Sequence, residues 1–181
     1  MTDSFVVFEQ TIEGLFVRGL AGKLTPGVHQ RLKALGIDLS HKLLPAYPFH
    51  TWMKALELAA AEVFHGEPTD KAMFKLGELF IDGYQHTQLG RALLEMIKVL
   101  GPRRALQRST ANFRAGNNFT ETRLTDLTPT SNELWMNEVG PYPAFTAGTL
   151  SAVTRASGAR DVKVEVAAYD GHSATYRVSW R

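Results

Sequence analysis

The stretch QLGRALLEMIKVL, residues 88–100, decides the helical character of the first part of the chain. Its apolar residues recur at spacings of three and four, which place them along one face of an α-helix. These residues are Leu89, Ala92, Leu93, Met96, Ile97 and Leu100. The pair Gly101-Pro102 follows, and such a pair ends a helix. The sequence therefore predicts an amphipathic helix from Gln88 to Leu100.

Three more helices are predicted on the N-terminal side of this stretch, over residues 25–36, 52–64 and 69–83. The first has Thr25 as a capping residue and Pro26 at the first helical position. The other two have apolar residues at helical spacing, and Thr69 is positioned to cap the last one. A further helix is predicted over residues 103–112.

Beyond residue 112 the pattern changes from helical to alternating. Segments 118–125 and 133–139 are predicted strands, rich in threonine or in alternating apolar residues. Segment 144–156 is a predicted helix whose small residues allow it to lie close against a sheet. Segments 161–169 and 174–180 alternate again and read as two strands of a final hairpin.

The register of this hairpin follows from its apolar faces. A two-residue loop at Asp170-Gly171 would place Val164 opposite Arg177 and would split the apolar face between the two sides of the sheet. A loop of odd length, or a bulge with the same parity, keeps the face intact. We therefore expect three pairs: Val162 with Trp180, Val164 with Val178, and Val166 with Tyr176.

Together these elements predict an α+β fold, in which an N-terminal helical layer packs on a small C-terminal antiparallel sheet with one intervening helix. A chain of 181 residues without a linker fits one domain. We expect a single domain over residues 1–181, mainly helical over 1–112 and strand-strand-helix-hairpin over 113–181.

Composition narrows the functional classes. The chain has 20 basic and 18 acidic residues in a scattered arrangement, so a nucleic-acid partner is not expected. No apolar run approaches the roughly 20 residues that span a bilayer, and the N-terminus lacks a basic leader region. We expect no membrane span and a cytoplasmic location.

No catalytic constellation stands out. The chain has no cysteine, and its six histidines lack the paired spacing of metal sites. Motifs for hydroxyl nucleophiles and phosphate loops are absent. A lone histidine is chemically sufficient as an axial haem ligand, although a surface position is commoner for such a residue. We expect no metal, no cofactor and no enzymatic activity.

The candidate ligand-binding residues lie where the helical part meets the sheet. Leu93, Met96 and Ile97 are on the apolar face of the 88–100 helix, and Met136 is on a predicted strand. Mostly apolar pockets between layers are the usual small-molecule sites. Three arginines near this junction are candidate contacts for a carboxylate or phosphate, namely Arg103, Arg104 and Arg114. The alternative is a basic helix face in solvent, which is the commoner arrangement.

Several segments resemble an expanded family of uncharacterised myxobacterial proteins, over essentially the whole chain. They are Ile12-Glu13-Gly14-Leu15-Phe16, Leu43-Leu44-Pro45-Ala46-Tyr47-Pro48, Leu89-Gly90-Arg91-Ala92, Leu100-Gly101-Pro102-Arg103-Arg104 and Phe113-Arg114-Ala115-Gly116-Asn117-Asn118. The resemblance implies no activity, because that family has no assigned function.

The order of elements is more distantly similar to the haem nitric-oxide-binding domains, the vinyl-four-reductase ligand-binding domains and related trafficking subunits. The haem members have a histidine shortly after the helix that corresponds to residues 88–100, where this chain has Gly101-Pro102-Arg103-Arg104. Their Tyr-x-Ser-x-Arg motif falls on Met136-Asn137-Glu138-Val139-Gly140. The resemblance therefore carries over no functional residue.

Two interpretations of function remain open. The first is a non-enzymatic small-molecule-binding or sensory and regulatory domain with a largely apolar pocket. The alternative is a protein-interaction or dimerisation module without a ligand. The candidate partners are thus a small apolar or anionic ligand, a second copy of the chain, or another protein.

Overall fold

The computed structural model describes residues 4–181. Its N-terminal elements are β1 (Val6–Phe8), α1 (Glu9–Ile12), the π-helix η1 (Glu13–Gly19), α2 (Pro26–Ala34), β2 (Ala46–Pro48) and α3 (Phe49–Val63). Four helices follow, α4 (Thr69–Tyr84), α5 (Gln88–Leu100), α6 (Pro102–Gln107) and α7 (Ser109–Arg114). The C-terminal part contains β3 (Thr122–Thr128), β4 (Ser131–Met136), α8 (Pro143–Ala156), β5 (Lys163–Tyr169) and β6 (Ala174–Ser179). The predicted α+β fold is confirmed.

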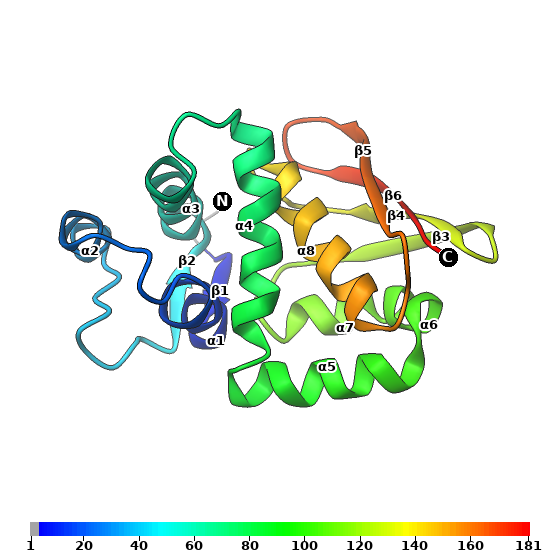
Figure 1. Ribbon diagram of the computed structural model, residues 1–181, viewed down its shortest axis with the longest axis horizontal. Helices are drawn as coiled ribbons and strands as arrows, with labels where there is room; N and C mark the ends of the chain where they lie inside the picture. Colours follow the sequence, from blue (N-terminus) through cyan, green and yellow to red (C-terminus); the bar gives the residue numbers. More distant parts are fainter. Residues whose placement is uncertain (1–3) are drawn as a thin grey trace.

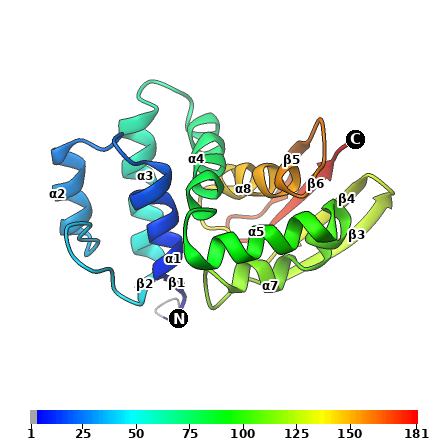
Figure 2. The ribbon, with the colours of Figure 1, turned by 60° about the horizontal axis from the view of Figure 1, so that its bottom comes forward.

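Helix α4 stands between the two parts of the molecule. In Figure 1 the N-terminal helices lie on one side of α4, and α8 with the four-stranded sheet lies on the other. Helices α5 and α7 run beneath them and come forward in Figure 2. The η1 helix approaches α4 closely because a glycine of α4 lies at the contact. A Cβ on Gly83 of α4 would lie 1.9 Å from the carbonyl oxygen of Gly14 in η1. A side chain at Gly83 therefore cannot be accommodated without moving η1.

Helix α5 begins and ends where the sequence predicts, but its buried face differs. The Thr87 hydroxyl caps it by accepting a hydrogen bond from the backbone N–H of Gly90 at 3.0 Å. The buried side is centred on Leu94 and Ile97, while Leu89 is 38% exposed. The helix is thus rotated relative to the predicted face, because its neighbours lie on the Leu94 side.

Other element boundaries needed correction. The helix predicted over 103–112 is two short helices, α6 and α7, which meet at Arg108 with ψ near 10°. The strand predicted over 118–125 begins at Thr122, and the strand predicted over 133–139 is shifted to 131–136. Residues 117–121 form instead a loop that side chains hold in place.

The larger sheet has the strand order β3-β4-β6-β5, with antiparallel neighbours throughout. In the hairpin Val164 pairs with Val178 and Val166 with Tyr176, and a bulge follows between Val166 and Ala168. The predicted parity is therefore confirmed, through the bulge. The ladder begins at the pair Lys163–Ser179, so the expected pair of Val162 with Trp180 lies outside it.

A second, two-stranded sheet near the N-terminus was not predicted. Strands β1 and β2 are antiparallel, with Val7 opposite Tyr47. Val7 also forms a bridge with Asn117, so the N-terminal strand is attached directly to the loop before β3. Among residues 4–181, no helix has both the length and the apolar character needed to cross a membrane.

Candidate functional site

A cavity of about 110 Å³ lies at the junction of the helical part and the sheet. Its walls come from α3 and α4 on one side, from α5, α6 and α7 on another, and from the 116–120 loop, the end of β4 and α8. Most of the lining side chains are apolar. The cavity thus lies between layers, which is the position that the sequence indicated for a pocket.

The aromatic wall of this cavity is a set of rings in mutual contact. Trp52 of α3 contacts Phe80 of α4 with ring centroids 6.2 Å apart, and it contacts Phe145 of α8 at 5.7 Å. The ring of Tyr84 lies 5.4 Å from that of Phe80. Burial raises the pKa of Tyr84 to about 12, so its hydroxyl stays protonated at neutral pH.

Of the four apolar residues predicted for the pocket, three line the cavity and one does not. Leu93 and Ile97 of α5 and Met136 of β4 line the cavity. Met96 is not among the lining residues, and Leu94 takes a place that the sequence pattern did not assign to it. The rotation of α5 accounts for this exchange. The binding role of these residues stays a prediction.

The three predicted arginines are not part of the cavity wall. The Arg103 guanidinium pairs with Asp126 of β3, which lowers the pKa of that carboxyl and raises the pKa of the guanidinium. Arg104 is exposed. Arg114 donates from Nε to the carbonyl oxygen of Thr120 at 2.8 Å and from Nη1 to that of Asn118 at 2.6 Å. The structure therefore does not bring the three guanidinium groups together.

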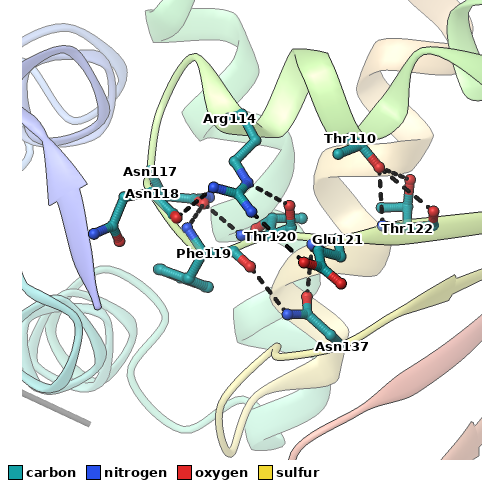
Figure 3. Close-up of polar contacts among 9 residues, drawn as sticks. All are labelled: Thr110, Arg114, Asn117, Asn118, Phe119, Thr120, Glu121, Thr122 and Asn137. Carbon is teal, nitrogen blue, oxygen red and sulfur yellow. Dashed lines mark hydrogen bonds and ion pairs between the residues drawn. The ribbon is translucent and has the colours of Figure 1, made fainter. Parts of the chain in front are cut away.

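Arg114 instead belongs to a network that shapes the loop beside the cavity (Figure 3). The Asn117 Oδ1 atom accepts hydrogen bonds from the backbone N–H groups of Phe119 and Thr120, at 3.0 and 2.9 Å. Asn137 donates from Nδ2 to the carbonyl oxygen of Phe119 at 3.0 Å. Since Phe119 and Thr120 line the cavity, this network fixes one of its walls.

The same loop attaches the N-terminal strand. Asn118 accepts from the backbone N–H of Val6 at 2.9 Å and donates from Nδ2 to the carbonyl oxygen of Ser4 at 2.8 Å. The Phe119 ring stacks on Phe5 at 4.8 Å. The cavity wall and the N-terminal strand are therefore held by one short segment. The sequence offers only a weak signal for this segment, the turn-forming residues at 116–118.

Two of the polar side chains that line the cavity differ in how fully they are hydrogen-bonded. Glu138 is largely enclosed, and its carboxylate accepts from the backbone N–H of Gly140 at 2.8 Å and faces His172 Nδ1 at 3.5 Å. Asn112 of α7 donates from Nδ2 to the carbonyl oxygen of Ala105 at 3.2 Å. Its Oδ1 atom is buried and has no hydrogen-bond partner among the described residues. Such an unpaired buried acceptor costs about 1–3 kcal/mol.

The fold defined by these elements is similar to that of H-NOX domains. An H-NOX protein from K. algicida in the Fe(II) unliganded state superposes with a TM-score of 0.59 at 12% identity, over 95% of both chains. An oxygen-binding H-NOX domain related to soluble guanylate cyclases gives 0.61 at 13% identity, over 95% of this chain and 92% of the other. A Cs H-NOX mutant gives 0.62 at 11% identity, over 95% and 93%. At this identity the likeness concerns the fold.

The chain belongs to the family described as "Protein of unknown function (DUF2378)", whose model matches residues 5–181. The resemblance to a family without an assigned function and the distant likeness to the haem nitric-oxide-binding fold are both confirmed. A comparison with curated proteins finds no match.

Proposed function

We propose that this protein is a non-enzymatic sensory domain that binds a small, largely apolar molecule in the cavity between α5, α7 and α8. The observation that carries the proposal is the cavity itself, apolar and lined by elements from both parts of the molecule. The H-NOX fold supports it, since one of the similar structures is described as oxygen-binding. Fold likeness alone would be a weaker argument than a site.

The residues present do not fit a haem group, which the descriptions of two similar structures mention. Among the described residues, the cavity lining contains no histidine, and the chain has no cysteine. Tyr84 lines the cavity, but its raised pKa opposes the tyrosinate form that binds iron. The lining formed by residues 4–181 also contains the Glu138 carboxylate and no lysine or arginine, whereas haem propionates would need a cation as a partner. We therefore assign no haem chemistry to this chain.

The size of the cavity points to a small ligand. A volume of about 110 Å³ is well below the roughly 300 Å³ at which pockets for drug-sized molecules begin. Apolar cavities of roughly 150 Å³ hold molecules of the size of benzene. A neutral molecule of about that size suits these walls, because an anion would lose its hydration and find no lysine, arginine or histidine in the described part of the lining to pair with.

Native mass spectrometry of the freshly purified full chain, followed by solvent extraction, tests this function. We expect a small molecule to be retained by the wild-type protein and lost in Ala105→Leu, because Ala105 lines the cavity and the larger side chain fills it. The matched control is Ala111→Leu on the exposed side of α7, which should retain the molecule.

An empty monomer that also fails to bind small apolar probes would contradict the proposal. An empty, tight dimer would favour the alternative, a dimerisation module without a ligand. Equal retention by both leucine variants would place the molecule outside the cavity and would contradict the site.

A further inference from the structure

The Oδ1 atom of Asn112 is a polar atom of the cavity wall that the fold itself does not use. Among the described residues, four buried side-chain atoms lack a hydrogen-bond partner, and Asn112 Oδ1 is the one that belongs to a cavity-lining residue. Buried polar groups in proteins nearly always have partners, so an exception in a cavity wall calls for an explanation.

The orientation of the amide is fixed by its other end. Asn112 Nδ2 donates to the carbonyl oxygen of Ala105 in α6. Turning the amide over would place two oxygen acceptors against each other, so Nδ2 must face Ala105 and Oδ1 must remain the free end. The break between α6 and α7 at Arg108 is what brings residues 105 and 112 together.

Several other polar groups of the lining have partners within the fold. The Thr11 hydroxyl donates to the carbonyl oxygen of Gly116, the Ser109 hydroxyl to that of Leu106, and the Thr149 hydroxyl to that of Phe145. The Glu138 carboxylate accepts from Gly140. A ligand in the cavity therefore meets mostly apolar surface, and Asn112 contributes an acceptor that no group of the described residues uses.

We infer that Asn112 sets the specificity of the cavity by accepting a hydrogen bond from an O–H or N–H group of a small neutral ligand, in the manner of a phenol or a short alcohol. This inference rests on the proposed function and adds the chemical class of the ligand. A site with a buried acceptor discriminates against analogues that lack the donor, since those analogues leave the acceptor unpaired.

Phenol and toluene are the probes, because they differ by the exchange of a hydroxyl for a methyl group of similar size. The dissociation constant of each is measured by calorimetry or NMR titration on the full chain. We expect the preference for phenol over toluene to fall about tenfold in Asn112→Leu, the effect of losing one buried hydrogen bond. The control is Gln107→Leu on the exposed side of α6, which should keep the wild-type preference.

The outcomes separate the two proposals. If both probes bind and Asn112→Leu keeps the wild-type preference, the role of Asn112 is wrong and the binding function stands. If neither probe binds the wild-type protein, the cavity does not take ligands of this size and both proposals fail.

A measurement on the wild-type chain covers the case in which Asn112→Leu does not fold. The side-chain amide signal of Asn112 should shift on addition of phenol and stay in place with toluene at equal occupancy. Equal shifts with the two probes would overturn the inference.

Discussion

Gly148 of α8 lies so close to α4 that a Cβ atom on it would come within 1.9 Å of the carbonyl oxygen of Phe74. Gly77 of α4 has the reciprocal relationship, since its Cβ would lie 2.1 Å from the carbonyl oxygen of Phe145. The two helices therefore approach each other backbone to backbone. This contact connects α8, which lies on the sheet, to the helix between the two parts of the molecule.

We expect Gly148→Ala to lower the free energy of unfolding by about 2 kcal/mol or more, because a methyl group forces the helices apart. Denaturant unfolding followed by circular dichroism measures the change. Gly27→Ala is the control: its Cβ would meet only the Thr25 hydroxyl, at 3.9 Å, within the first turn of α2. That substitution should be neutral or stabilising by about 0.5–1 kcal/mol. Similar effects for both variants would contradict the close approach.

The hairpin gives a second prediction, on strand packing. Val178 is fully buried on β6, whereas Val166 on the neighbouring edge strand is 41% exposed. We expect Val178→Ala to destabilise the protein by about 2 kcal/mol, and Val166→Ala by less than half of that, in proportion to the apolar surface lost from the interior. Equal losses in chemical unfolding would mean that the edge strand is covered in solution.

The sequence predicts the local structure of each element better than it predicts which other elements that element packs against. The ends of α5 follow from Thr87, Gly101 and the apolar period, and the hairpin parity follows from alternation alone. The buried face of α5 does not, because Leu94 extends its apolar surface beyond the predicted stripe. Which part of that surface is covered depends on where α4 and α8 lie. The π-helix η1 packs closely against Gly83 of α4, and a local pattern does not encode such a contact.

The candidate site was predictable only in its apolar part. Periodicity indicated Leu93, Ile97 and Met136, which do line the cavity. The predicted arginines are near the junction in sequence, but in the structure Arg103 pairs with Asp126 and Arg114 donates to the carbonyl groups of the 118–120 segment. Asn112 carries no sequence signal, since its position depends on the break between α6 and α7.

The Arg103–Asp126 pair leads to a prediction about pH. The Arg103 guanidinium and the Asn132 amide hold the pKa of Asp126 below its ordinary value. A carboxyl with a lowered pKa in the folded state stabilises the fold above its unfolded pKa of about 3.9, and that contribution is lost as the pH falls through the folded pKa. The pair is exposed, so the loss is small.

We therefore expect Arg103→Gln to raise the pKa of Asp126 toward its ordinary value, as measured by NMR titration of the carboxyl carbon. Arg108→Gln is the matched control, because Arg108 is also an exposed arginine nearby and should leave that pKa unchanged. An Asp126 pKa that does not respond to Arg103→Gln would show that the ion pair is not formed in solution.

Arg114 is expected to matter for structure far more than Arg104, although both arginines are exposed. Its guanidinium satisfies the carbonyl oxygens of Asn118 and Thr120 from two nitrogen atoms. Arg114→Ala leaves these carbonyl groups without that donor, and we expect a loss of about 1–3 kcal/mol in the free energy of unfolding. Arg114→Lys should recover little of it, because an ammonium group does not reproduce the planar fork of donors. Arg104→Ala should stay within about 0.5 kcal/mol of wild type, as substitutions on an exposed surface usually do.

Backbone amide hydrogen exchange shows which part of the fold the Arg114→Ala substitution loosens. The backbone N–H groups of Phe119 and Thr120 are bound to Asn117 Oδ1, and the N–H of Asn118 is bound to the carbonyl oxygen of Val6. If the guanidinium holds this loop, Arg114→Ala speeds exchange at these three amides and weakens the attachment of β1, while the amides of β6 keep their wild-type protection. Uniformly faster exchange would mean instead that the variant loosens the whole fold. Unchanged exchange at residues 118–120 would mean that Asn117 and Asn137 hold the cavity wall without the arginine.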